Sequence, residues 1–149
     1  MQASATESFL EHLVTSFRVA IGKALLAPGS VQLSKALFEA PFALLAHDAS
    51  SDPIYNFGNQ RALLLWEMNF DEFTRMPSRL CAEPVHQATR QAFLSEVERC
   101  GFVAGYTGIR ISKTGRRFRI VDAVCWNVFD AQGVRLGQAA CFDRVIELE

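Results

Sequence analysis

One carboxylate interrupts the stretch FRIVDAVCWNVF, residues 118–129, which otherwise reads as a buried β-strand. A lone acid such as Asp122 must be paired, protonated or functional there, because burying an unpaired charge is costly. Tight turns at KTGR and DAQG set Asp122 opposite Thr107 on one neighbouring strand and Cys141 on the other. These three side chains can orient a small ligand, or they can form a satisfied polar group within the core.

The same register gathers small residues beside Trp126 on the face that carries Asp122. Gly105, Gly137 and Ala139 leave space there, which either a ligand or a helix side chain must fill, and Trp126 is a candidate wall of that pocket. The predicted opposite face is also largely apolar, so both faces must be covered. Its members are Tyr106, Arg110, Arg119, Val121, Ala123, Cys125, Leu136, Gln138, Ala140 and Phe142. A one-residue slip in register would exchange the two faces.

The sequence carries no motif of an established catalytic class. GxSxG, HExxH, a Walker loop and GxGxxG are all absent, so we do not expect an enzyme. The three histidines, His12, His47 and His86, form no metal-ligand spacing with the cysteines, and we expect no metal site. None of the four cysteines forms a CxxC motif, which indicates free thiols.

The charge balance and the N-terminus exclude two further classes. Lysine and arginine number 15 against 16 aspartate and glutamate, so no broad basic surface is available to bind nucleic acid. The N-terminal residues lack a basic start followed by a long apolar run, which excludes a signal peptide and a membrane anchor. We therefore expect a cytoplasmic protein.

The periodicity of the chain predicts an α+β fold. An amphipathic helix is expected over residues 6–26, stopped by Pro28-Gly29, and a short helix over 32–38. Two short strands follow, at 42–48 and 54–57, and then three helices, the first capped by Asn59 and the last ended by Gly101. After Gly101 the period changes to two, which predicts an antiparallel meander of three strands.

The leading helix can serve two purposes. We expect residues 1–37 to form a helical extension and residues 38–149 the compact domain. The stripe of Leu10, Leu13, Phe17, Ile21 and Ala24 either covers the second face of the sheet or pairs with its copy in a homodimer.

Three blocks of the sequence carry a family resemblance. FGNQRALLLWEMNFDEF, RMPSRLCAEPVHQATR and the region from GIRISKTGRRF to GQAACF resemble the MEKHLA domain, a PAS-like family, over residues 38–144. The resemblance implies a five-stranded antiparallel sheet with helices cupping one face. Such domains occur alone in bacteria and at the C-termini of some plant homeodomain-zipper regulators, and their implied role is sensing or protein interaction.

The resemblance does not indicate a particular cofactor. In haem-binding PAS sensors the axial histidine aligns with Thr89, and His86 is displaced from that position. In flavin-binding light sensors the reactive cysteine aligns with Arg79, and Cys81 is shifted. The sequence therefore does not indicate which ligand, if any, is bound.

Two functions remain open. The first is a stand-alone sensory domain that binds a small molecule between sheet and helices and signals through an unknown protein partner or through self-association. Its candidate contacts are Asp122, Thr107, Trp126, Cys141, His86 and Trp66. The second is a pure interaction or dimerisation module whose pocket is filled by its own side chains.

Overall fold

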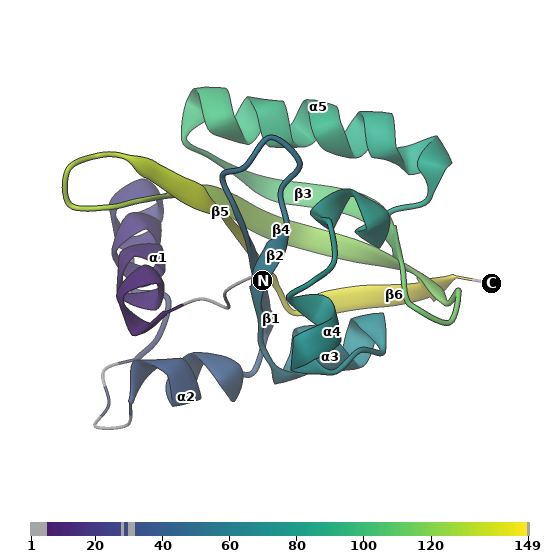
Figure 1. Ribbon diagram of the computed structural model, residues 1–149, viewed down its shortest axis with the longest axis horizontal. Helices are drawn as coiled ribbons and strands as arrows, with labels where there is room; N and C mark the ends of the chain where they lie inside the picture. Colours follow the sequence, from purple (N-terminus) through teal and green to yellow (C-terminus); the bar gives the residue numbers. More distant parts are fainter. Residues whose placement is uncertain (1–5, 28, 30–31, 149) are drawn as a thin grey trace.

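The computed structural model describes residues 6–27, 29 and 32–148, and its centre is an antiparallel sheet in the order β2-β1-β5-β4-β3 (Figure 1). The strands are β1 (Ala43–Asp48), β2 (Tyr55–Gly58), β3 (Phe102–Ile111), β4 (Arg117–Phe129), β5 (Arg135–Phe142) and β6 (Arg144–Leu148). The helices are α1 (Glu7–Ile21), α2 (Leu33–Phe38), α3 (Gln60–Trp66), α4 (Phe70–Phe73), the 3-10 helix η1 (Ser78–Cys81) and α5 (Pro84–Cys100). The α+β class and the five-stranded PAS-like sheet are confirmed.

Strand β6 was not expected from the sequence. It pairs with the first half of β4, from Arg117 to Val121, whereas β5 pairs with the second half, from Val124 to Phe129. The two strands thus follow one another along the same side of β4, separated by Asp143. Its sequence, RVIEL, mixes charged and apolar residues, which suits a strand whose side chains are mostly exposed or half-buried.

Helix α1 starts where the sequence indicates and ends earlier. The Thr6 side chain accepts a hydrogen bond from the backbone N–H of Phe9, at 3.1 Å, and so caps the first turn. The helix ends at Ile21 because Gly22 adopts a left-handed conformation, with φ 87°. The predicted continuation to residue 26 is therefore wrong, and Pro28, the expected stop, lies outside the described residues.

The apolar stripe of α1 packs against the chain's own sheet. Leu10, Leu13 and Phe17 are at most 4% exposed, and the Phe17 ring meets Trp126 edge-on, with centroids 4.8 Å apart. The Trp126 indole N–H donates to the Leu13 carbonyl oxygen, at 3.1 Å. The part of the stripe formed by Leu10, Leu13 and Phe17 is thus buried within one chain, and a homodimer through this helix stays a prediction.

Asn59 ties the helices of the other face to the sheet. Its Oδ1 accepts hydrogen bonds from the backbone N–H groups of Ala62 and Leu44, and its Nδ2 donates to the carbonyls of Leu37 and Phe42. The predicted cap of α3 is confirmed, and the same side chain holds the end of α2 and the start of β1. The helices α3, α4 and α5 then lie over the face opposite α1 (Figure 1).

A β-bulge at Asp122 reverses the predicted faces of β4. Asp122 is exposed and adopts φ 62°, and Gly105 on β3, with φ 73°, lies where the pairing of β3 with β4 shifts. The extra residue turns the following side chains over, so Phe118 and Ile120 share a core with Ala123, while Trp126 belongs to the core under α1. The expected single face containing Phe118, Asp122 and Trp126 is therefore wrong.

The pairing of residues beside both turns also differs from the expected register. Ile111 lies opposite Arg117, one position from the predicted partner, because Ser112 and Arg116 enclose a three-residue loop with Gly115 at φ 90°. Val124 lies opposite Cys141, two positions from the predicted partner, and a shift of two preserves the faces.

Candidate functional site

The sheet and helix α5 enclose a small internal cavity of about 50 Å³. Its apolar and aromatic lining includes Leu45, Ala46, Phe93, Ile120, Ala123 and Phe142. The lining residues with polar groups include His47, Tyr55, Trp66, Arg90, Arg110 and Gln138. A mostly apolar cavity with a few convergent polar groups has the composition of a small-molecule site.

Arg90 occupies a position on α5 that faces the core. It stands in a helical stripe with Phe93, Leu94 and Val97, of which the first two line the cavity and the third is fully buried. Arg90 itself is only 6% exposed, and the Tyr55 hydroxyl lies within its hydrogen-bonding range. A guanidinium therefore replaces an apolar side chain in the inner stripe of this helix.

Arg110 brings a second guanidinium to the cavity from strand β3. It is 6% exposed, and it donates to the Ile109 carbonyl at 2.8 Å and to the Tyr106 hydroxyl at 3.2 Å. Phe93 stacks on the Tyr106 ring, with centroids 3.6 Å apart, so α5 also holds the side chain that orients Arg110. The two arginines approach the cavity from different elements.

Among the described residues, no aspartate or glutamate lines the cavity with these two cations. The carboxylates of Asp52 and Glu98 border the outer groove that Arg90 also reaches. Within residues 6–27, 29 and 32–148, neither Arg90 nor Arg110 forms an ion pair. A buried cation without a counter-charge is costly, so both guanidinium groups would be stabilised by an anion in the cavity.

His47 contributes a hydrogen-bond acceptor. Its Nδ1 donates to the Asp48 carbonyl at 2.8 Å, which leaves Nε2 as the basic nitrogen, and Nε2 is buried without a partner among the described residues. Burial lowers the pKa of His47 to about 4, against the effect of the Asp48 carbonyl, and the positive charges of Arg90 and Arg135 lower it further. His47 is therefore neutral at pH 7.

Other buried groups of the site are also neutral. Burial raises the pKa of the Tyr55 hydroxyl, and the neighbouring Cys81 thiol raises it further. Burial raises the pKa of Cys125 to about 12, so this thiol is not a nucleophile at pH 7. The indole Nε1–H of Trp66 is buried and has no partner within the described part of the chain. The arginines are thus the charged groups of this cavity.

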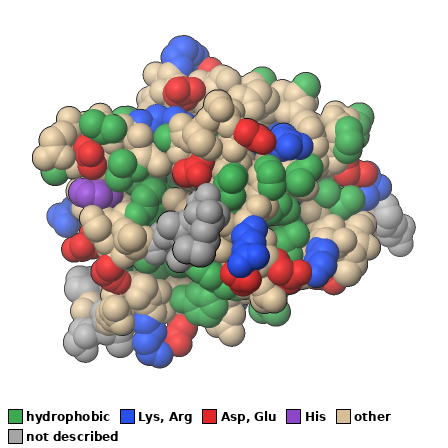
Figure 2. Space-filling view, viewed as in Figure 1, with side chains coloured by type: hydrophobic (Ala, Val, Ile, Leu, Met, Phe, Trp, Pro, Cys, Tyr) green, Lys and Arg blue, Asp and Glu red, His purple; other side chains and the backbone are tan. Residues whose placement is uncertain are grey.

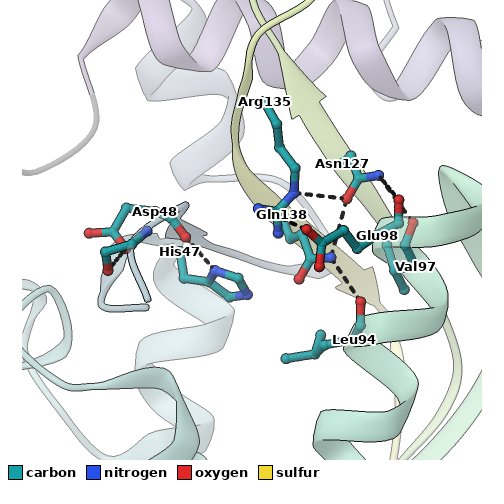
Figure 3. A network of polar contacts seen from close by, with 9 residues as sticks. His47, Asp48, Leu94, Val97, Glu98, Asn127, Arg135 and Gln138 are labelled. Carbon is teal, nitrogen blue, oxygen red and sulfur yellow. Dashed lines mark hydrogen bonds and ion pairs between the residues drawn. The ribbon is translucent and has the colours of Figure 1, made fainter. Parts of the chain in front are cut away.

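A polar network fixes α5 over the cavity (Figure 3). Asn127 on β4 donates to the Val97 carbonyl at 3.1 Å, and Gln138 on β5 donates to the Leu94 carbonyl at 3.1 Å. Gln138 also donates to the Asn127 side-chain oxygen, at 3.2 Å. These bonds satisfy carbonyls of α5 and attach it to two strands, so the helix that carries Arg90 has a defined position.

The binding residues that the sequence predicted do not all lie together in the structure. Trp66 lines the cavity, as expected. His86 and Thr107 come together, but in a shallow outer depression between α5 and β3. Asp122 is exposed at the bulge, and Trp126 and Cys141 lie on the α1 side of the sheet, where burial raises the pKa of the Cys141 thiol to about 12. The predicted placement of Asp122, Thr107, Trp126 and Cys141 in one pocket is wrong because the bulge lies between them.

Sequence reasoning missed Arg90 and placed Arg110 away from the site. The signal for Arg90 was present, because its spacing from Phe93, Leu94 and Val97 is that of one helix face. Seven members of the predicted opposite face in fact line the cavity: Tyr106, Arg110, Ala123, Cys125, Gln138, Ala140 and Phe142.

Charges of both signs are mixed on the outer surface. On the face seen in Figure 2, basic and acidic side chains are interspersed, with no continuous basic area. Within the described ranges, no three His, Cys, Asp or Glu side chains are grouped to hold a metal ion. No described helix combines the length and the apolar character needed to cross a membrane.

A known protein family matches most of this chain. Residues 7–146 match the MEKHLA domain. The chain belongs to the MEKHLA domain family. The match begins at the first residue of α1, and α1 packs into the same core as the sheet. The division into an extension of residues 1–37 and a domain of residues 38–149 stays a prediction. The comparison with curated proteins finds no match.

Solved structures similar to this MEKHLA domain are PAS and light-oxygen-voltage domains. A PAS domain from Colwellia psychrerythraea is 17% identical, with a TM-score of 0.64 over 78% of this chain and 94% of that one. A light-oxygen-voltage domain studied with a flavin analogue is 16% identical, with a TM-score of 0.62 over 80% and 87%. An RNA-binding light-oxygen-voltage receptor is 13% identical, with a TM-score of 0.61 over 78% and 32%. The chain therefore has the fold of PAS and light-oxygen-voltage domains.

Proposed function

We propose that this MEKHLA domain is a non-catalytic sensor that binds a small molecule in the cavity under α5 and transmits binding through contacts with a protein partner or with its own copy. The observation that carries the proposal is the cavity itself, because it joins an apolar lining to buried polar groups that the described residues leave unpartnered. The small residues Ala123 and Ala140 keep this space open.

A flavin does not fit the cavity. The light-oxygen-voltage neighbours share the fold, but a volume of about 50 Å³ is too small for three fused rings. Cys81 lies in η1, is 1% exposed and does not line the cavity, so it is not placed to react with a bound ring. The proposed ligand is accordingly a much smaller molecule.

The alternative is an interaction module without a ligand. It is favoured by exposed apolar side chains such as Leu64, 69% exposed, and Val85, 77% exposed, which can contact a partner surface. In this alternative the cavity is a packing defect, and filling it stabilises the protein without any change in binding.

Native mass spectrometry of the freshly purified protein tests the proposal. We expect the wild type to carry a small added mass and Ala123→Leu, which fills the cavity, to lose it. Val124→Leu is the matched control, because the adjacent side chain packs on the α1 side of the same strand. An added mass retained by Ala123→Leu would contradict the proposal, as would a wild type at its bare mass that binds none of the small molecules named below.

A further inference from the structure

Two buried guanidinium groups meet in a space without a counter-charge. Arg90 and Arg110 are each 6% exposed, both line the cavity, and no aspartate or glutamate lines it with them. Both arginines line the cavity together with Tyr55 and Cys125, and both act electrostatically on these two groups. A carboxylate placed there would supply the missing charge and accept planar pairs of N–H groups, which guanidinium groups donate well.

Each arginine retains donors for a ligand. A guanidinium carries five N–H groups, whereas Arg110 makes two hydrogen bonds and Arg90 has the Tyr55 hydroxyl in range. Each also reaches the border of the cavity: Arg90 lines an outer groove beside the Ser50–Pro53 loop, and Arg110 lines the shallow depression next to Thr107. Both arginines thus line the cavity and also border a surface depression, and most of the remaining lining is apolar.

The size and lining of the cavity limit the ligand. A volume of about 50 Å³ corresponds to roughly four water-sized positions, which excludes nucleotides and sugars. Because the lining is mostly apolar, an anion with an apolar part gains more from burial there than a strongly hydrated ion such as phosphate. The remaining class is an anion with a small apolar body.

We infer that the cavity binds a short aliphatic monocarboxylate, with its carboxylate between Arg90 and Arg110 and its apolar part against Ala123 and Ile120. This inference rests on the proposed function and names the chemical class of its ligand. The buried indole N–H of Trp66, which also lines the cavity, is a third donor available to the site.

Binding of matched acids and amides to the wild type tests the inference. Isothermal titration at pH 7 in a carboxylate-free buffer would use sodium butyrate and sodium propionate, their neutral counterparts butyramide and propionamide, and sodium phosphate. We expect the acids to bind roughly 10- to 100-fold more tightly than the amides, because a charge-assisted hydrogen bond is lost in each amide. Phosphate should not bind detectably.

Arginine variants assign the effect to the cavity. Arg90→Met and Arg110→Met keep the length of the side chain and remove its charge, and each should weaken butyrate binding by a similar roughly 10- to 100-fold. Arg75→Met is the control, because Arg75 is exposed on the surface and pairs with Asp71. If a variant does not fold, the acid–amide comparison in the wild type still decides the question.

The outcomes separate this inference from the proposed function. Acids and amides that bind equally, phosphate that binds as well as butyrate, or unchanged butyrate binding in both arginine variants would overturn the carboxylate class and leave a small-molecule sensor. Failure of every probe to bind, together with a wild type at its bare mass, would overturn both.

Discussion

The two faces of the sheet are covered by helices of similar length in opposite ways. Helix α1, with 15 residues, buries Leu10, Leu13 and Phe17 and leaves the Trp126 indole bonded to its backbone. Helix α5, with 17 residues, fully buries only Arg90 and Val97 and leaves a cavity beneath it. The comparison indicates that the α1 face is the more tightly packed of the two and that the α5 face leaves the space in which we propose that a ligand binds.

Removal of Trp126 should have the largest effect. Trp126→Ala leaves a large void under α1 and an unpaired Leu13 carbonyl, and we expect a loss of about 3–5 kcal/mol in the free energy of unfolding. Urea denaturation measures it. Phe102→Ala is the control, because Phe102 lies opposite Trp126 on β3 and is 39% exposed. Equal losses in the two variants would contradict the structural role given to the α1 face.

The α5 face should instead respond to pH through His47. Because burial lowers the pKa of His47 from 6.5 to about 4, the unfolded chain binds the proton more readily between these values. The contribution of His47 to stability is therefore fully present above pH 6.5 and is lost as the pH falls toward 4, by about 3 kcal/mol in all.

Urea denaturation from pH 7.5 to pH 4 checks this dependence in the wild type, His47→Gln and the control His12→Gln. His47→Gln should lose most of the pH dependence in this range, and His12→Gln should retain it. A pH profile that is unchanged in His47→Gln would mean that another group causes the loss.

Asp122, at the junction between the two faces, should have a smaller and purely conformational effect. At φ 62° a β-branched residue is strained, so Asp122→Val should cost about 1–3 kcal/mol, whereas Asp122→Gly should cost little or stabilise. Thermal unfolding of the two variants measures the difference. A loss in Asp122→Gly as large as in Asp122→Val would show that the carboxylate itself matters.

The sequence allowed the element order, the PAS-like sheet and the two helix-covered faces to be predicted, because these depend on periodicity and on caps such as Asn59. The side-chain faces of β4 could not be predicted, since one bulge at Asp122 reverses them and no local pattern marks it. The prediction that Asp122, Thr107, Trp126 and Cys141 share one pocket was wrong for the same reason. Arg90 was missed because a charged side chain on a helix is usually solvated, although its spacing from Phe93, Leu94 and Val97 is that of one helix face.

The unfolding free energy of Arg90→Met, with and without sodium butyrate, tests the difference between the faces most directly. Without butyrate we expect this variant to be at least as stable as the wild type, because a buried cation without a counter-charge is removed. With butyrate, the wild type should gain stability and the variant should not. A variant that loses more than about 2 kcal/mol without butyrate, yet gains as much from butyrate as the wild type, would show that Arg90 supports the fold and does not bind the ligand.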